Sequence, residues 1–519
     1  MDRRDFLKSA GLATAAIGMG SLWSRSAQAA WGDVSAAVWP APPDLKILEI
    51  HLLGGVAPFE SFYYRPPAGL RTRGFDAEIS SLLWNASCAN TPVGLQVDSF
   101  FANDSNTKEI RLGPFAKPLW RPDIRDHMRV VVLSHDLLPH EAAIPYALTG
   151  LRLGNPNQAS LGAAIAHRYQ LMSPRALPYA YGLVSDTAGG GGINSLLTST
   201  MGSFGRHPGD ARPMVLKIGP GFATFISQLQ RTNMSADKDA LLNQYRAQYR
   251  DWLRYQGAGS PTRSNAFRDY DTSVGALLQA ASLSTFLNTI STTIPNSPEC
   301  AREPSQVFDT SPNATKTALQ AAAYLLTRPA AERARYVCVI DGGIEPRVGL
   351  PYDVHTAGHP GDTSSNLWNV FDTLAGLINN PADPPDPNKL NLSDTLIIIN
   401  TEFGRTPCKS APGPAPLGTV CDASSMGRDH WPQAYVNVMI GGPINTRGVV
   451  GSISDAAGLG AIADISYSAT DVRAAALVAA GINPFESETF ALGQLSASLT
   501  ALSHEQAMIN LRQTILGVS

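Results

Sequence analysis

Residues 394–410 read DTLIIINTEFGRTPCKS, and residues 426–442 of the same stretch read MGRDHWPQAYVNVMIGG. The apolar, β-branched run at residues 396–399 predicts a strand buried on both faces, as in the centre of a parallel sheet. Glu402 and Arg405 come directly after this strand. They are therefore expected at the carboxyl edge of the sheet, where ligands bind in open α/β folds.

A second apolar strand is expected at residues 434–440, and Asp429 and His430 directly precede it. If the two strands are neighbours, these side chains and Glu402 lie at adjacent strand ends. The stretch therefore predicts an α/β fold in which a carboxylate and a histidine meet over one site.

Apolar runs and helical periods continue along the rest of the chain. Strands are expected at residues 45–53, 128–133, 179–184 and 336–340. Helices are expected from near His140 and at residues 161–169, 236–255, 272–289, 314–326, 365–377, 470–480 and 504–515. Strands that alternate with helices predict a mainly parallel central sheet with helices on both faces. Ser364 or Thr363 is expected to cap the helix at 365–377, and a small antiparallel element is expected at 448–453.

The chain divides into four segments. Residues 1–30 are expected to be a signal peptide, residues 44–187 the first part of the core, and residues 313–519 its second part. A four-glycine run and two helical periods make residues 188–312 a mostly helical insertion or lid, with ordinary peripheral helices as the alternative.

The N-terminus predicts export. Residues 3–8 read RRDFLK, a twin-arginine motif, and a short apolar region and the small-residue site AQA at residues 27–29 follow. The apolar region is too short and too glycine-rich for a stable membrane anchor. The twin-arginine translocase is therefore the expected export partner, and the periplasm or the exterior is the expected destination.

Charge and cysteine content narrow the possibilities further. The 519 residues carry 40 basic and 43 acidic side chains, a net charge of -3, which gives no electrostatic case for nucleic acid as a partner. The five cysteines show no metal-type CxxC spacing. Cys408 and Cys421 bracket a Pro/Gly-rich loop and could form a disulfide after export, whereas Cys338 is expected to be a buried thiol.

One carboxylate and two imidazoles lie close together just after the strand at 336–340: Asp353, His355 and His359. With Glu402 and His430 they form an oxygen-and-nitrogen ligand set that suits zinc first, with manganese or iron as alternatives. Some of the candidate residues also have a simpler explanation. Glu402 could pair with Arg405, Asp429 could orient His430 or cap a strand, and isolated histidines such as His51 are usually structural.

Six segments together carry a family resemblance: EIHLLGG, PHEAAIPYALTG, ASLGAAIAHRYQ, YDVHTAGH, SDTLIIINTEFGRT and GRDHWPQAYVNVMIGG. In this order after a twin-arginine signal, they resemble an uncharacterised exported bacterial family with a domain of unknown function. By fold that family is similar to the alkaline phosphatase and sulfatase superfamily. The resemblance implies a mostly parallel sheet, one or two divalent metals at the strand ends, and attack on a phosphate or sulfate ester.

Residue by residue, the resemblance places His355, His359, Glu402 and His430 at metal-binding positions and His140 at the nucleophile position. The chain departs from the superfamily at two places. Ala57 stands near the end of the first strand, where the related exported family usually has an aspartate, and Phe403 stands where phosphatases have a second ligand. One metal is therefore expected rather than two.

Two functional hypotheses follow. The first is an exported single-metal hydrolase of a small-molecule or polymeric phosphate or sulfate ester. In it Arg405 neutralises charge on the transferred group, His140 or a water on the metal attacks, and Asp353 or Asp429 orients a ligand histidine. The second is a catalytically degenerate, secreted binding or scaffold protein on the same fold.

Overall fold

The computed structural model describes residues 45–65, 98–152, 159–172, 180–185, 213–218, 235–257, 313–330, 333–343, 352–353, 355, 359–406, 429–454, 462–485 and 495–518. The signal peptide, the four-glycine run, the helix expected at 272–289 and the disulfide between Cys408 and Cys421 lie outside the described residues. In the described part Cys338 is a buried free thiol, as the sequence predicts.

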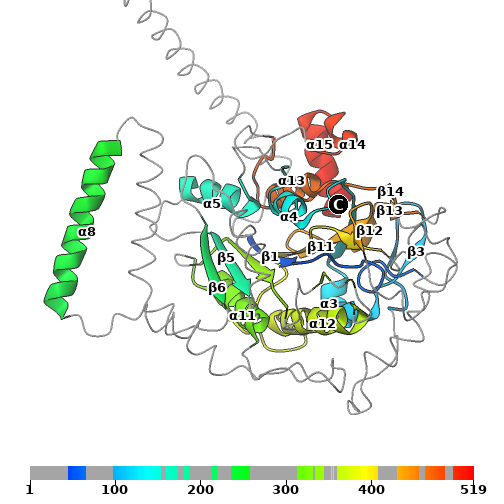
Figure 1. Cartoon of the computed structure of the whole chain (residues 1–519), viewed down its shortest axis with the longest axis horizontal. Helices are drawn as coiled ribbons and strands as arrows, with labels where there is room; N and C mark the ends of the chain where they lie inside the picture. Colours follow the sequence, from blue (N-terminus) through cyan, green and yellow to red (C-terminus); the bar gives the residue numbers. More distant parts are fainter. Residues whose placement is uncertain are drawn as a thin grey trace, which may run out of the picture.

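An eight-stranded sheet forms the centre of the molecule (Figure 1). Its strands follow the order β12-β4-β11-β8-β1-β7-β5-β6. Its strands are β1 (Lys46–Leu52), β4 (Met128–Leu133), β5 (Ala180–Ser185), β6 (Met214–Ile218), β7 (Tyr336–Asp341), β8 (Thr395–Asn400), β11 (Tyr435–Gly441) and β12 (Gly448–Val450). Among these strands β11 alone runs antiparallel to its two neighbours, β4 and β8. The mainly parallel sheet is therefore confirmed.

Helices cover both faces of this sheet, as predicted (Figure 1). One face carries η1 (Pro114–Trp120), α3 (Pro122–Arg125), α11 (Ala314–Thr327) and α12 (His359–Leu377). The other face carries α4 (His140–Thr149), α5 (Leu161–Met172), α13 (Ala469–Ala479), α14 (Ala497–Thr500), α15 (His504–Asn510) and the π-helical turn Leu511–Ile515. Each layer has its own apolar core against the sheet.

The central strand β1 is buried along its whole length, because it lies between β7 and β8 and under helices on both sides. Its side chains alternate between the two faces. Leu48 and Ile50 join the core under α11 and α12, and Ile47 joins the core under α4 and α13. Glu49 and His51 share the face of Ile47 and are fully buried.

Arg473 of α13 balances the buried charge of Glu49. Its Nη1 atom lies 2.6 Å from Oε2 of Glu49, and Tyr336 and Asn400 donate to the same carboxylate at 2.5 and 3.1 Å. Burial alone would raise the pKa of Glu49, but the charge and hydrogen bonds of Arg473 lower it overall. This ion pair fixes α13 over the middle of β1.

Two local predictions are wrong. The helix expected at 365–377 begins at His359, so neither Ser364 nor Thr363 is its cap. Pro360 lies at the second position of the helix and suits its first turn, a start signal that is independent of a Ser or Thr cap. At 448–453 only the second half is antiparallel: β12 joins the central sheet parallel to β4, and β13 (Ser452–Ile453) pairs with β14 (Ala463–Ile465).

The segment at 188–312 contains two described elements. Met214–Ile218 forms β6, which extends the central sheet beside β5 and was not anticipated. The helix α8 (Ala236–Gly257) lies to one side of the sheet in Figure 1 and exposes Leu241, Tyr245 and Trp252. Short two-residue strands complete the described elements: β2 (Ala102–Asn103), β3 (Glu109–Ile110), β9 (Gly404–Arg405) and β10 (His430–Trp431). Among the described helices, none combines the length and the apolar character needed to cross a membrane.

Candidate metal centre

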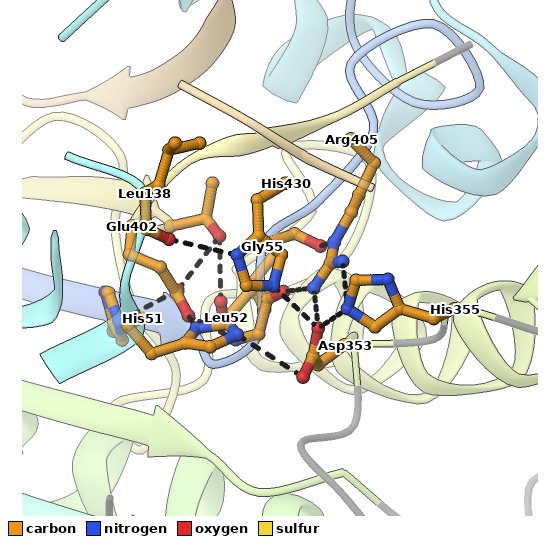
Figure 2. Close-up of polar contacts among 12 residues, drawn as sticks. His51, Leu52, Gly55, Leu138, Asp353, His355, Glu402, Arg405 and His430 are labelled. Atoms are coloured by element: carbon orange, nitrogen blue, oxygen red, sulfur yellow. Dashed lines mark hydrogen bonds and ion pairs between the residues drawn. The ribbon is translucent and has the colours of Figure 1, made fainter. Parts of the chain in front are cut away.

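Side chains from four distant segments meet at the carboxyl edge of the sheet (Figure 2). The ends of β1, β4 and β8 all lie at this edge, since the three strands run in the same direction. The antiparallel β11 begins there, so the residues before it arrive beside the end of β8. Pairing of β9 with β10 then sets His430 opposite Arg405.

Asp353 is the hub of this cluster. Its Oδ1 atom lies 2.8 Å from Nε2 of His355 and 3.1 Å from Nε2 of His430, and it accepts a hydrogen bond from Nη2 of Arg405. Its Oδ2 atom lies 3.3 Å from Nε2 of His140. Burial would raise the pKa of Asp353, but its contacts with His140 and His430 and the charge of Arg405 hold that pKa far below its usual range.

His140 is the first residue of α4, and it lies between two carboxylates. On the side opposite to Asp353, its Nδ1 atom lies 2.8 Å from Oε1 of the fully buried Glu402. Burial would lower the pKa of His140, but the two carboxylates outweigh it and raise the pKa to about 9. The pKa of Glu402 is lowered, because the contact with His140 outweighs the effect of burial.

The hydrogen-bond partners define the tautomers of two histidines. Nδ1 of His430 lies 2.9 Å from the carbonyl oxygen of Leu138, which can only accept, so this nitrogen carries a proton. Nδ1 of His140 faces an ionised carboxylate and must also carry one. The Nε2 atoms of both rings point at Asp353. In the neutral rings these are lone pairs aimed at carboxylate oxygens, an arrangement that needs either a proton on each ring or a shared cation.

A divalent cation fits this geometry. The ligand atoms of His140, Asp353 and His430 all lie within 4.8 Å of one another. Nε2 of His140 is buried and satisfies no hydrogen-bond geometry, despite its closeness to Asp353. Two imidazole nitrogens and one carboxylate oxygen are typical zinc ligands, and three protein ligands leave a coordination position open for a substrate.

The guanidinium of Arg405 is fully buried and is already bound by groups of the protein. It donates to Asp353, to the carbonyl of Gly54 and, at 3.3 Å from Nε, to the carbonyl of Gly55. Its positive charge therefore balances Asp353 inside the cluster.

His355 and Asp429 form the exposed rim of the cluster. Nδ1 of His355 lies 3.5 Å from Oδ1 of Asp429, and the two side chains are 41% and 44% exposed. The other ring nitrogen of His355 contacts Asp353. This pair is thus the part of the cluster that a molecule arriving from solvent meets first.

The backbone next to Asp353 is fixed by buried groups. The hydroxyl of Tyr352 donates to Asp341, at the end of β7, over 2.5 Å, and the amide of Gly343 donates to the same carboxylate at 2.9 Å. Gly54 has φ +126°, and a Cβ atom there would lie 2.6 Å from the backbone nitrogen of Asp353. The turn after β1 therefore requires glycine at this position.

Most of the predicted site residues lie in this one cluster: His140, Asp353, His355, Glu402, Arg405, Asp429 and His430. The side chain of His359, the first residue of α12, lies outside the described part, and the individual roles stay predictions. His51 is an addition that the sequence analysis treated as structural. It is fully buried, with Nε2 3.5 Å from Oε2 of Glu402. Its position near the carboxyl end of the central strand could have pointed to it.

The chain belongs to the family described as "Protein of unknown function (DUF1501)", whose pattern matches residues 47–510. Among solved structures it is similar to alkaline phosphatase from the Antarctic bacterium TAB5, at 10% identity and a TM-score of 0.31, over 78% of this chain and 94% of that one. A histidine-to-aspartate mutant of the same enzyme, with Mg bound in its M3 site, gives 10% identity, a TM-score of 0.30 and the same coverage. No curated protein sequence matches the chain.

Proposed function

We propose that the protein is an exported, metal-dependent hydrolase of a phosphate or sulfate ester, with one divalent cation bound by His140, Asp353 and His430. One observation carries the proposal: two histidines held as Nδ1–H tautomers aim their Nε2 atoms at the same carboxylate. Zinc is the first choice for this donor set, with manganese and iron as alternatives. When bound, the cation supplies Lewis-acid stabilisation of an ester oxygen.

The proposal changes several residue roles relative to the sequence hypothesis. Asp353 becomes a ligand instead of an orienting residue, and His355 moves from the ligand set to the exposed rim. His140 becomes a ligand instead of the nucleophile, because its Nε2 atom faces the carboxylate shared with His430. Glu402 supports that ligand from behind, because its carboxylate contacts Nδ1 of His140. Arg405 keeps Asp353 ionised and oriented rather than binding the ester.

The exposed rim is the side of the cluster from which a substrate would enter in this proposal. His355 and Asp429 are the exposed members of the cluster, and His355 also contacts Asp353. In this proposal the ester approaches over the rim that His355 and Asp429 form. The twin-arginine motif at residues 3–8 supports export through the twin-arginine translocase, which would place the reaction in the periplasm or outside the cell.

The test combines metal content with turnover. The purified mature protein is expected to hold about one equivalent of zinc, manganese or iron and to hydrolyse an aryl phosphate or an aryl sulfate. His430→Ala is expected to lose both the metal and the activity, whereas His504→Asn, an exposed histidine outside the cluster, should keep both. Folded wild-type protein that binds none of the three metals would overturn the proposal.

A degenerate binding protein on the same fold is the second candidate. The contacts of Arg405 favour this second candidate. The buried guanidinium is bound to Asp353 and to backbone carbonyls, so it is not open to an anionic substrate. Ala57 and Phe403 stand where the resembling families have acidic or metal-binding side chains. Protein that holds one metal but turns over neither ester class would favour this candidate over the hydrolase.

A further inference from the structure

We infer that Glu402 is a positioning residue, which fixes the tautomer of His140 and holds the Nε2 atom of that ring toward the cation site. The inference rests on the proposed metal site. It assigns Glu402 to the support of a ligand, a role different from the direct coordination that the sequence resemblance implies.

The first step in the argument is the geometry of the carboxylate. Oε1 of Glu402 accepts from the amide of Gly54 at 2.7 Å and lies 2.8 Å from Nδ1 of His140. Both donors approach the same oxygen, so this atom is fixed between the turn after β1 and the first turn of α4. An ionised carboxylate can only accept, so the ring must supply its own Nδ1–H to Oε1.

The second step is the other oxygen of Glu402. Oε2 lies 3.3 Å from the hydroxyl of Thr401 and 3.5 Å from Nε2 of the fully buried His51. Both groups belong to the interior of the sheet edge. Protein groups thus contact both oxygens of the Glu402 carboxylate, which lies beside Nδ1 of His140. Asp353 lies beside Nε2, on the other side of the same ring.

The third step is that residue 402 also holds the backbone leading to His140. The carbonyl of Glu402 accepts from Nε2 of His135 at 2.7 Å, and Nδ1 of His135 accepts from the amide of Leu137 at 3.1 Å. Pro139 precedes α4 and provides no side-chain cap. Both ends of the segment from His135 to His140 therefore contact Glu402. His135 binds its backbone carbonyl, and His140 contacts its side-chain carboxylate.

A carboxylate behind a ligand histidine fixes the orientation of the ring and raises its basicity, and its removal typically weakens metal affinity by about 10- to 100-fold. We therefore expect Glu402→Leu to weaken cobalt(II) binding by about 10- to 100-fold. Glu402→Gln keeps an oxygen acceptor for the Nδ1–H and should weaken binding less. The exposed neighbour Glu141, on the same helix turn, provides the matched control. Glu141→Gln removes one nearby carboxylate and should leave the affinity unchanged.

The experiment measures cobalt(II) affinity and the proton NMR spectrum of the cobalt-loaded protein. In wild-type protein, His140 and His430 should each give a paramagnetically shifted, exchangeable Nδ1–H signal. Glu402→Leu should lose or broaden the His140 signal, because that proton then exchanges with solvent without a partner, and Glu402→Gln should retain it. A purely structural role would lower the melting temperature without changing this signal.

The outcomes separate this inference from the proposed function. Folded wild-type protein that binds no cobalt, zinc, manganese or iron overturns both. Wild-type protein that binds cobalt, together with Glu402 variants that match its affinity and its spectrum, overturns the positioning role alone. If Glu402→Leu does not fold, Glu402→Gln decides: wild-type affinity in that variant overturns the inference, and weaker affinity with a retained signal supports it.

Discussion

The carboxylate of Asp353 faces the guanidinium of Arg405 and the rings of three histidines. Arg405 is fully buried, so the loss of the carboxylate it contacts removes the largest compensation for a positive charge in the interior. We expect Asp353→Asn to lower the free energy of unfolding of the metal-free protein by about 3 kcal/mol. Asp429→Asn, on the exposed rim, should change it by no more than about 0.5 kcal/mol. Urea denaturation measures both, and equal effects would contradict the central position of Asp353.

We expect metal binding to depend on pH through His140. Its pKa is raised to about 9 in the absence of metal, and a cation at Nε2 must displace the proton held there. The apparent affinity for zinc should therefore rise about tenfold per pH unit from roughly pH 7 to pH 9 and level off above that range. Calorimetry in buffers with different ionisation enthalpies would report the released proton. An affinity that stays constant between pH 7 and pH 9 would show that His140 is not a ligand.

At the scale of single elements, the turn after β1 holds the site together through backbone groups. The Gly54 amide donates to Glu402, and the carbonyls of Gly54 and Gly55 accept from Arg405. The turn thus contributes backbone groups, rather than side chains, to the cluster.

Gly54→Ala tests this turn. The added Cβ would meet the backbone of Asp353, and φ +126° is strained for alanine, so we expect a loss of about 1–3 kcal/mol in stability together with weaker metal binding. Gly376→Ala is the matched control. Nothing lies within 4 Å of a Cβ at Gly376 in α12, and helix propensity predicts a gain of up to about 1 kcal/mol. Thermal unfolding and zinc titration of both variants provide the measurement, and an unaffected Gly54→Ala protein would contradict the argument.

Elements were predictable where one physical signal dominates. The short, β-branched apolar run at 396–399 favours a buried strand over a helix, and β8 lies there. The start of α12 and the pairing of β12 depend on competing local signals and on the partner that the sheet offers, so the sequence alone placed them incorrectly. The edge strand β6 is short and lies in a segment that was expected to be mostly helical.

Over the whole molecule, the candidate site exists only because the sheet brings distant segments together. Gly54 and Glu402 are 348 residues apart in the chain and share a hydrogen bond of 2.7 Å. Strand-end reasoning predicted that Glu402, His430 and Asp353 would be near one another. It could not predict which atoms face each other, because ring orientation and tautomer depend on partners such as Leu138, and the sequence does not indicate such partners.

We expect a site assembled in this way to couple metal binding to folding, because the unfolded chain offers no comparable arrangement of ligands. Free zinc at about 1,000 times its Kd should stabilise the folded protein by about 4 kcal/mol. A chelator should therefore lower the Tm of the wild-type protein by several degrees and leave the Tm of His430→Ala unchanged. Differential scanning calorimetry of both proteins, with and without chelator, checks this. Equal Tm values in wild-type protein would mean that no cation contributes to the fold.

The most direct measurement is an anomalous-difference map from crystals of the mature, metal-loaded protein, collected at the absorption edge of the bound metal. We predict a single peak bonded to Nε2 of His140, Nε2 of His430 and the carboxylate of Asp353, with Glu402 behind His140. A peak coordinated by Glu402 instead, or no peak within reach of Asp353 in metal-loaded crystals, would contradict the account.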